Sequence, residues 1–211
     1  MQIITAIVCL GLLVWTGPAS AQNAAAQKEY SLTVSVHEDV RPKLTADEVK
    51  KILEDASGLL KNNHCDAAFK LQGEVGTFAN APAIIRTSRE RDAVHGVNAD
   101  VKVVVDIEFC KPSLGVSVFN GCAFPFSEGR KSMIVTHARA APGLLRAILW
   151  THEFGHRTGL QHRADPEAVM TGCSNLFGDQ LKINEEECRC YRLGPGGCTK
   201  PDPGQVCSDR R

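Results

Sequence analysis

The sequence has no excess of charge of either sign. Its 211 residues include 24 Lys and Arg and 24 Asp and Glu, so the net charge is zero and the pI is about 7.0. A chain without a basic or acidic balance offers no electrostatic reason to bind nucleic acid or an anionic membrane. Internal repeats at the spacing of solenoid proteins are also missing. With 43% hydrophobic residues, the composition excludes a disordered chain and indicates a compact domain.

Long apolar runs are scarce as well. The longest run, residues 3–15, has about thirteen residues and is too short to cross a bilayer as a helix. It ends at Gly17 and Pro18, before the small residues 19–21, which is typical of a signal peptide before its cleavage site. We therefore expect residues 1–21 to be a signal peptide and the mature protein to be secreted or periplasmic, with no membrane attachment. A short membrane anchor is the alternative, because no Lys or Arg precedes the run.

CxxC pairs, the usual mark of zinc ribbons, are absent. Eight cysteines remain after residue 21, namely Cys65, Cys110, Cys122, Cys173, Cys188, Cys190, Cys198 and Cys207. An even number in an exported protein predicts up to four disulfides, whose pairing the sequence leaves open. The alternative is a second zinc site made by the last four of these thiols, although their spacing does not match that of known sites.

The most informative segment is the run HEFGHRTGLQH. His152 and His156 are four residues apart, so in a helix they lie on one face and can direct two imidazole nitrogens at a single ion. Glu153 is offset from them, which keeps its carboxylate out of the coordination shell but close to it. Gly159 can take the left-handed conformation that ends a helix and turns the chain. That turn brings His162 back as a third ligand.

Three neutral imidazoles leave one tetrahedral position open, which is the arrangement of a catalytic zinc site. We therefore expect one catalytic Zn²⁺ ion and a peptidase that forms no covalent intermediate. Glu153 is expected to be the general base, accepting a proton from the water that attacks the scissile carbonyl and passing it to the leaving amine.

The pattern HExxHxxGxxH resembles that of the metzincin clan of zinc metalloproteases. Met170, eight residues after His162, resembles the Met-turn methionine that lies beneath the zinc in that clan, although a plain core methionine is the alternative. HEFGHRTGL and PEAVM are most similar to the matrixin-like group. The resemblance spans residues 148–171 and implies an extended protein or peptide substrate bound at a sheet edge, for which residues 115–119 and the loop before Ser132 are the candidates.

Some positions differ from the matrixin pattern. Arg163 stands where matrixins usually have Ser, and Thr171 and Gly172 stand where Tyr-Pro is typical. No Tyr follows two residues after Met170, so we do not expect an additional tyrosine ligand. No cysteine lies between the predicted cleavage site and the first strand, so we expect no covalent self-inhibition. Residues 163–172 are expected to form a wall of the primary side-chain pocket.

The pattern of apolar residues predicts an α+β fold. Alternation and β-branched runs predict strands at residues 31–37, 69–78, 101–109, 115–119 and 132–136. Helices are expected from the Thr45–Glu48 capping box to Asn63, from about Pro142 to Thr158, and from the Asn184 cap to about Gly194. Together these predict a metzincin-like zincin domain, in which a mixed sheet of about five strands lies over the active-site helix, with a short cysteine-rich C-terminal part.

We expect residues 22–193 to form the catalytic domain and residues 194–211 a Gly/Pro/Cys-rich tail. The tail is interpreted as a stapled end, with a specificity or docking element as the alternative. The sequence thus predicts a monomeric, exported zinc endopeptidase; whether it needs structural calcium stays open. A protein-binding module of the same fold with little proteolytic activity is the main alternative. A small inhibitor-like disulfide protein is a weaker one, because the apolar core is large.

Overall fold

The computed structural model describes residues 27–108, 121–123, 132–137, 143–163, 165–171 and 181–198. The predicted signal peptide, the predicted strand at 115–119 and residues 199–211 of the predicted tail lie outside these ranges. Within them, no helix has both the length and the apolar character needed to cross a membrane.

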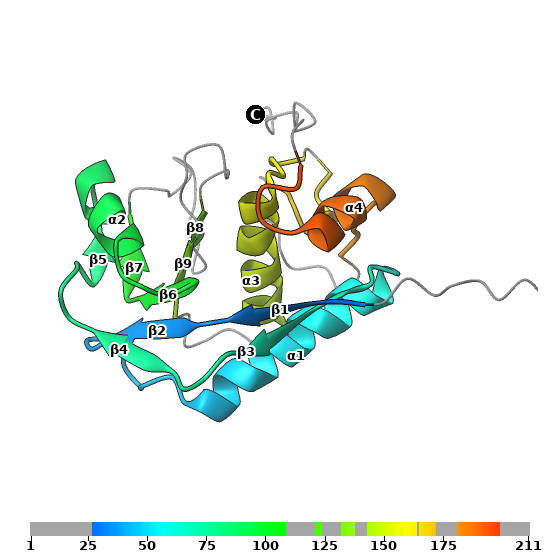
Figure 1. The fold of residues 1–211 in the computed structure, drawn as a ribbon. Coiled ribbons are helices and arrows are strands. Elements are labelled where there is room, and N and C mark those ends of the chain that lie inside the picture. The colour runs from blue at the N-terminus through cyan, green and yellow to red at the C-terminus, as the bar shows by residue number, and fades with distance from the viewer. Residues whose placement is uncertain are drawn as a thin grey trace, which may run out of the picture.

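The centre of the fold is a five-stranded sheet with the order β4-β2-β6-β9-β8 (Figure 1). Its strands are β2 (Val34–His37), β4 (Gly76–Phe78), β6 (Val101–Val104), β8 (Gly121–Ala123) and β9 (Met133–Thr136). The first four in the sheet order are parallel, and β8 runs antiparallel to β9. Two smaller parallel pairs join β1 (Lys28–Leu32) to β3 (Ala67–Leu71) and β5 (Ile84–Ile85) to β7 (Asp106–Ile107). The prediction of a mixed five-stranded sheet is therefore confirmed.

The membership of the sheet differs from the prediction. The single strand expected at residues 31–37 is broken at Thr33, because the Asp100 carboxylate accepts hydrogen bonds from the Thr33 amide (2.9 Å) and hydroxyl (2.8 Å). The single strand expected at residues 69–78 is also wrong. It is two strands in different sheets, β3 and β4, separated by Gly73 with φ +70°.

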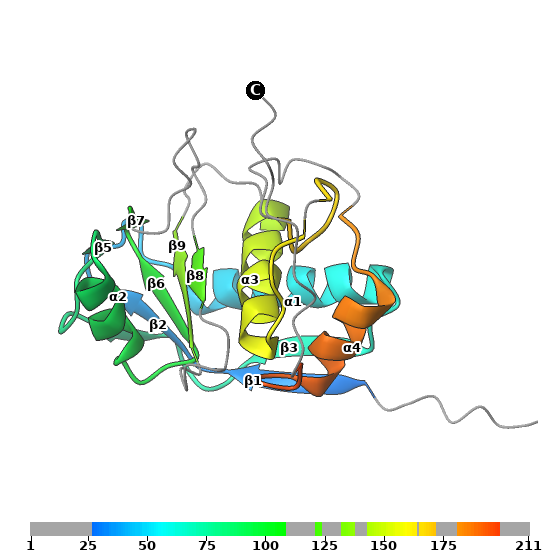
Figure 2. The same cartoon turned by 90° about the horizontal axis from the view of Figure 1, so that it is seen from above.

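The two faces of the sheet carry different helices (Figure 2). Successive residues of a strand point to opposite faces, so Val101 and Val103 of β6 belong to one apolar cluster and Val104 to another. The larger cluster is covered by α1 (Ala46–Asn62) and α3 (Gly143–Thr158), which pack against each other. The smaller cluster is covered by α2 (Ser88–His95), which buries little besides Val94. Sequence reasoning missed α2, although its Thr87 capping box was a usable signal.

The helix boundaries follow local signals. The capping boxes predicted at the starts of α1 and α4 (Glu185–Leu193) are both present, with Thr45 paired to Glu48 and Asn184 to Glu187. Helix α3 spans nearly the predicted range and also contacts β8, β9 and α4. Leu144, in the first turn of α3, is 45% exposed, and the buried part of the helix begins at Ala147.

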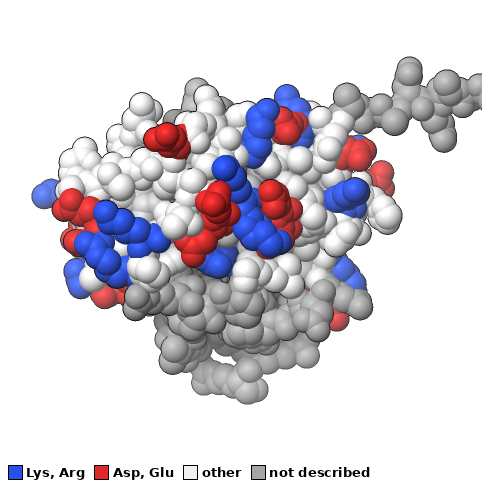
Figure 3. Space-filling view, turned by 90° about the horizontal axis from the view of Figure 1, so that it is seen from below, with Lys and Arg blue, Asp and Glu red and all other residues white. Residues whose placement is uncertain are grey.

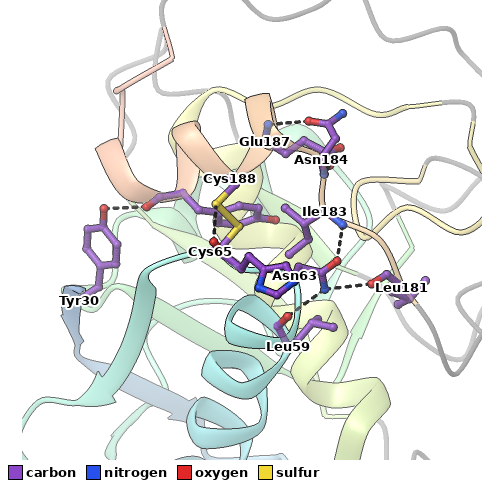
Figure 4. Close-up of a disulfide and its surroundings, with 11 residues drawn as sticks. Tyr30, Leu59, Asn63, Cys65, Leu181, Ile183, Asn184, Glu187 and Cys188 are labelled. Atoms are coloured by element: carbon purple, nitrogen blue, oxygen red, sulfur yellow. Dashed lines mark hydrogen bonds between the residues drawn. A yellow bond between two sulfur atoms is a disulfide. The ribbon is translucent and has the colours of Figure 1, made fainter. Parts of the chain in front are cut away.

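Helix α4 is fastened to α1 and to the first strand (Figure 4). A disulfide joins Cys65, just after α1, to Cys188 of α4. The Tyr30 hydroxyl on β1 donates to the carbonyls of Tyr191 (2.8 Å) and Arg192 (2.9 Å) at the end of α4. Burial raises the pKa of Tyr30 to about 12, so the hydroxyl keeps its proton at neutral pH.

The chain segment that leads into α4 is held in the same way. The Asn63 side chain accepts a hydrogen bond from the Ile183 amide (2.9 Å) and donates one to the Leu181 carbonyl (3.1 Å). A second disulfide joins Cys190 to Cys198. The alternative of a thiolate zinc site is therefore wrong for Cys188, Cys190 and Cys198, because their sulfur atoms are bonded to one another or to Cys65.

The surface reflects the balance of charge in the sequence. Figure 3 shows acidic and basic side chains interspersed on one face of the molecule. Exposed ion pairs such as Lys50 with Asp47 (3.5 Å) contribute to this pattern. Interspersed charges of both signs give this face little attraction for a polyanion.

Candidate metal centre

Three imidazole rings converge at the end of α3. The Nε2 atoms of His152 and His156 are 3.1 Å apart, and His162 Nε2 lies 3.2 Å from the first and 3.1 Å from the second. In the part of the chain that the structure describes, these residues are the group able to hold a metal ion. Zinc ligands at about 2.0–2.1 Å in a tetrahedral arrangement stand about 3.3–3.4 Å apart, so the three nitrogens fit zinc closely.

The other ring nitrogens of two of these histidines are held by backbone carbonyls. His152 Nδ1 lies 2.7 Å from the Val169 carbonyl, and His156 Nδ1 lies 2.8 Å from the Leu160 carbonyl. A carbonyl can only accept, so each Nδ1 carries the proton and donates it. Nε2 therefore keeps its lone pair and points toward the other two rings, which is the tautomer that binds a metal.

Burial keeps the rings neutral. Loss of solvation lowers the pKa of His152 to about 4 and that of His156 well below its ordinary value. The neighbouring imidazoles act in the same direction on both, and loss of solvation also lowers the pKa of the more exposed His162. Neutral imidazole is the form that coordinates a metal, so little free energy is spent on removing protons at neutral pH.

Gly159 turns the chain between the second and third histidines. Helix α3 ends at Thr158, and Gly159 follows with φ +107°, a conformation that residues with a side chain rarely adopt. A Cβ at this position would stand 2.5 Å from the Cys198 carbonyl oxygen. The absence of a side chain at Gly159 therefore allows the sharp turn toward His162. It also allows residues 194–198 to pack closely against the end of α3.

That segment covers the end of the helix that carries the histidines. The Gly196 amide donates to the Arg157 carbonyl (3.0 Å), and the Cys198 amide donates to the Thr158 carbonyl (2.9 Å). Two carbonyls that would otherwise lack a partner at the helix end are satisfied in this way. Residues 194–198, with the Cys190–Cys198 disulfide, thus act as a stapled cap on α3.

Glu153 and Met170 also lie inside this region. Glu153 follows His152 on α3 and is 4% exposed. Met170 is fully buried and packs against Gly155, where a Cβ would stand 2.3 Å from its sulfur. The Tyr191 hydroxyl of α4 lies 3.4 Å from the same sulfur and donates to the Thr151 carbonyl at 3.1 Å. Sequence reasoning missed Tyr191, because nothing in its spacing marks it.

Two other histidines in the described ranges, His37 and His95, have separate surroundings. His37 contacts the Ala81 carbonyl through Nε2 (2.9 Å) and accepts from the Asp39 amide at Nδ1 (3.0 Å). His95 Nδ1 lies 2.8 Å from the Ser132 hydroxyl. These contacts give the two rings structural roles away from the three converging histidines.

Strand β8 packs against α3, the helix that carries His152 and His156. It ends the order of the five-stranded sheet, runs antiparallel to β9 and contacts α3. The segments predicted to bind substrate, residues 115–119 and the loop before Ser132, lie almost wholly outside the described residues. β8 itself, which begins two residues after the first of these segments, is the described strand nearest to the prediction in the sequence.

Comparison of the sequence with protein-family models gives no match. Comparison with curated proteins gives none either. Among solved structures, the chain is similar to archaemetzincin from Methanopyrus kandleri, with 18% identity and a TM-score of 0.40 over 85% of this chain and 93% of that one. It is also similar to a chain described as the structure of a chaperone-substrate complex, with 15% identity and a TM-score of 0.43 over 77% of this chain. The chain spans about a third (34%) of the length of that second structure.

Proposed function

We propose that the chain is a zinc-dependent endopeptidase in which His152, His156 and His162 hold one catalytic zinc ion and Glu153 is the general base. The observation that carries the proposal is the near-equal separation of the three Nε2 atoms, 3.1–3.2 Å, with two of the rings fixed in the metal-binding tautomer. A structural zinc site would have a fourth protein ligand, and none lies with this group in the described residues.

The chemistry divides between the ion and Glu153. A bound zinc ion would polarise the substrate carbonyl and lower the pKa of water at the site. Glu153 lies one residue after His152, where its carboxylate can take the proton of the water that attacks the carbonyl. The same carboxyl group then gives the proton to the leaving amine. Because α3 buries Glu153, the proton passes between groups that are shielded from bulk solvent.

The position of strand β8 at the end of the described sheet order favours a peptide as the substrate. Among the described strands, β8 pairs only with β9, so an extended peptide could pair with the backbone N–H and C=O groups on its other side. Since β8 contacts α3, such a peptide would pass near the histidines. We propose that residues 115–123 provide this edge and that residues 163–172 form a wall of the adjoining pocket.

The finer assignments belong to the same proposal. The turn at Gly159 and the buried Met170 support a metzincin, and the stretches HEFGHRTGL and PEAVM favour its matrixin-like group, with residues 22–193 as the catalytic domain. Two disulfides within the described residues support a secreted or periplasmic location, where such bonds persist. We propose a monomer that acts on protein or peptide substrates.

The test uses the full mature protein, with metal analysis, a casein zymogram and the Glu153→Gln variant. The wild type is expected to contain one zinc per chain and to clear casein, and a chelator is expected to abolish clearing. Glu153→Gln is expected to retain zinc and lose at least about a hundredfold of activity. Glu54→Gln, an exposed change on α1 outside the proposed site, is the control and should keep full activity.

Two outcomes would contradict the proposal. Full turnover by Glu153→Gln would remove the assigned base. A wild type that binds zinc but clears no casein, and cleaves nothing in a proteome-derived peptide library, would favour the protein-binding alternative.

A further inference from the structure

Arg163 is the residue at which the sequence departs from the matrixin pattern directly after the third histidine. Its side chain is 27% exposed and lies between two carboxylates. Arg163 Nη2 is 3.2 Å from Asp165 Oδ2 in the same loop, and Arg163 Nε is 3.4 Å from Glu187 Oε1 on α4. The guanidinium therefore joins the loop that follows His162 to a helix more than twenty residues further along the chain.

Glu187 is well suited to hold this arginine. It is 5% exposed, and its other oxygen, Oε2, accepts a hydrogen bond from the Asn184 amide (2.8 Å) in the capping box of α4 (Figure 4). Because each of the two carboxylate oxygens of Glu187 has a partner, the orientation of this side chain is fixed. Removing one partner of a largely buried ion pair leaves the other without compensation.

The helix that carries Glu187 is itself held firmly. Cys188, the next residue, is bonded to Cys65 at the end of α1, and Cys190 is bonded to Cys198. The loop on the other side of the ion pair is also closed, since the Arg163 amide donates to the Met170 carbonyl at 2.8 Å. The position of Arg163 is thus set from α4 through its side chain and from Met170 through its backbone.

His162 has fewer constraints than the other two histidines. His152 and His156 are fixed by α3, whereas His162 lies three residues after the turn at Gly159 and is exposed. Within the described part of the chain, no hydrogen bond holds its Nδ1 as the carbonyls hold those of the other two rings, so the chain on its two sides has the larger part in placing it. Gly159 sets the direction of the chain before His162, and Arg163 holds the chain directly after it.

We propose that Arg163 and Glu187 are positioning residues for the third zinc ligand, with their ion pair holding the loop after His162 against α4. This inference rests on the proposed function, because it takes His162 to be a ligand. Neither residue is among the proposed zinc ligands, and neither is the proposed general base. Their effect is on the geometry and affinity of the metal site.

The experiment measures the zinc dissociation constant of the full mature protein by competition with a chromophoric chelator. The variants are Arg163→Gln, Glu187→Gln, the double variant and Arg163→Lys. Glu187→Gln keeps an oxygen for the cap of α4, and Arg163→Gln leaves that cap untouched, so folding is expected to be preserved in both. Partners that orient metal ligands typically change affinity by about 10-fold to 100-fold, and we expect each Gln variant to weaken zinc binding about tenfold.

Coupling and rescue distinguish positioning from a general loss of structure. The double variant is expected to be no weaker than Arg163→Gln, because that change already removes the ion pair with Glu187. Arg163→Lys, which keeps the charge but not the planar fork, should recover part of the affinity. The Co²⁺-substituted wild type should show the visible spectrum of a tetrahedral site, and both Gln variants should lose intensity.

The matched control is the exposed pair Lys182 and Glu167, which links the same loop to the segment before α4. Lys182→Gln and Glu167→Gln should leave zinc affinity within twofold of the wild type. Singles within twofold of the wild type, or additive losses in the double variant, would overturn the proposal. His162→Ala distinguishes failure of the proposed function from failure of this inference. Unchanged zinc affinity in His162→Ala would contradict the proposed function itself. Weaker zinc binding in His162→Ala, together with wild-type zinc affinity in Arg163→Gln, would contradict only this inference.

Discussion

Gly155 and Met170 lie so close together that a Cβ on the glycine would stand 2.3 Å from the methionine sulfur. Gly155 is on α3, one residue before the second histidine, and Met170 is in the loop after the third. A Cβ at position 155 would also stand 2.7 Å from the Tyr191 hydroxyl. Three parts of the chain therefore meet at a point where the helix has no side chain.

Gly155→Ala should destabilise the protein. Alanine favours a helix interior by about 1 kcal/mol over glycine, but the buried Met170 and Tyr191 would have to move to admit the methyl group. Overpacking of this kind typically costs about 1–3 kcal/mol, so we expect a net loss of about 1 kcal/mol or more. Urea denaturation followed by circular dichroism measures the free energy of unfolding.

Gly58→Ala is the matched control, because Gly58 is also inside a helix and a Cβ there would meet no atom within 4 Å. That change should raise the free energy of unfolding by about 0.5–1 kcal/mol. Equal stabilisation by the two substitutions would mean that the contact between Gly155 and Met170 does not restrict the helix.

The parts of the candidate site that the sequence predicted are those fixed by local geometry. The four-residue spacing of His152 and His156 places both rings on one helix face in any α-helix. The turn at Gly159 depends on the conformational freedom of that residue alone. Capping boxes such as that of Thr45 are also local, which explains why the ends of α1 and α4 agree with the prediction.

Features that depend on distant residues could not be predicted in this way. Thr33 breaks the first strand because Asp100, 67 residues later, takes its amide hydrogen bond. Tyr191 and Glu187 reach the metal centre only because disulfides and the Tyr30 hydroxyl hold α4 in place. A pattern of residue types along the chain carries no information about such pairings.

The two disulfides found within the described residues should contribute unequally to stability. In the chain-entropy account, the Cys190–Cys198 bond closes a loop with a sequence separation of 8, and its loss should cost about 2–3 kcal/mol. The Cys65–Cys188 bond has a separation of 123 and should be worth about 5 kcal/mol. Denaturation of the Cys190→Ser/Cys198→Ser and Cys65→Ser/Cys188→Ser variants compares them.

The smaller disulfide should matter more for the end of α3, because residues 196 and 198 satisfy the carbonyls of Arg157 and Thr158. In Cys190→Ser/Cys198→Ser, the amide hydrogen-exchange rates of the last turn of α3 should therefore increase. The increase should be larger than the change in the free energy of unfolding alone would produce. Exchange that follows global stability alone would show that the cap does not depend on this bond.

Zinc should stabilise the folded protein by mass action. A ligand that binds only the folded state adds about 2.7 kcal/mol at a free concentration one hundred times its dissociation constant. The melting temperature should rise as zinc is titrated into metal-free protein and fall again when a chelator is added. His162→Ala, which changes an exposed residue of the triad, should show a much smaller rise. An equal rise in both proteins would place the stabilising zinc elsewhere.

Lys102 predicts how stability changes with pH. It lies on β6, is 1% exposed, and donates a hydrogen bond to the His95 carbonyl at 3.4 Å. Burial lowers the pKa of Lys102 to about 8, with the nearby Arg157 acting in the same direction and Asp100 opposing them. The ordinary lysine pKa of about 10.5 applies in the unfolded chain, so between these values the unfolded state binds more protons than the folded state.

The free energy of unfolding should therefore rise with pH above 8, because the penalty for burying the charged lysine disappears as the folded protein loses that proton. The expected gain between pH 8 and pH 9.5 is about 1.5 kcal/mol. Lys102→Met, which fills a similar volume without a charge, should remove this gain while other titrating groups such as Tyr30 act equally in both proteins. Urea denaturation at both pH values decides the matter: parallel changes in the wild type and the variant would show that Lys102 is not the group responsible.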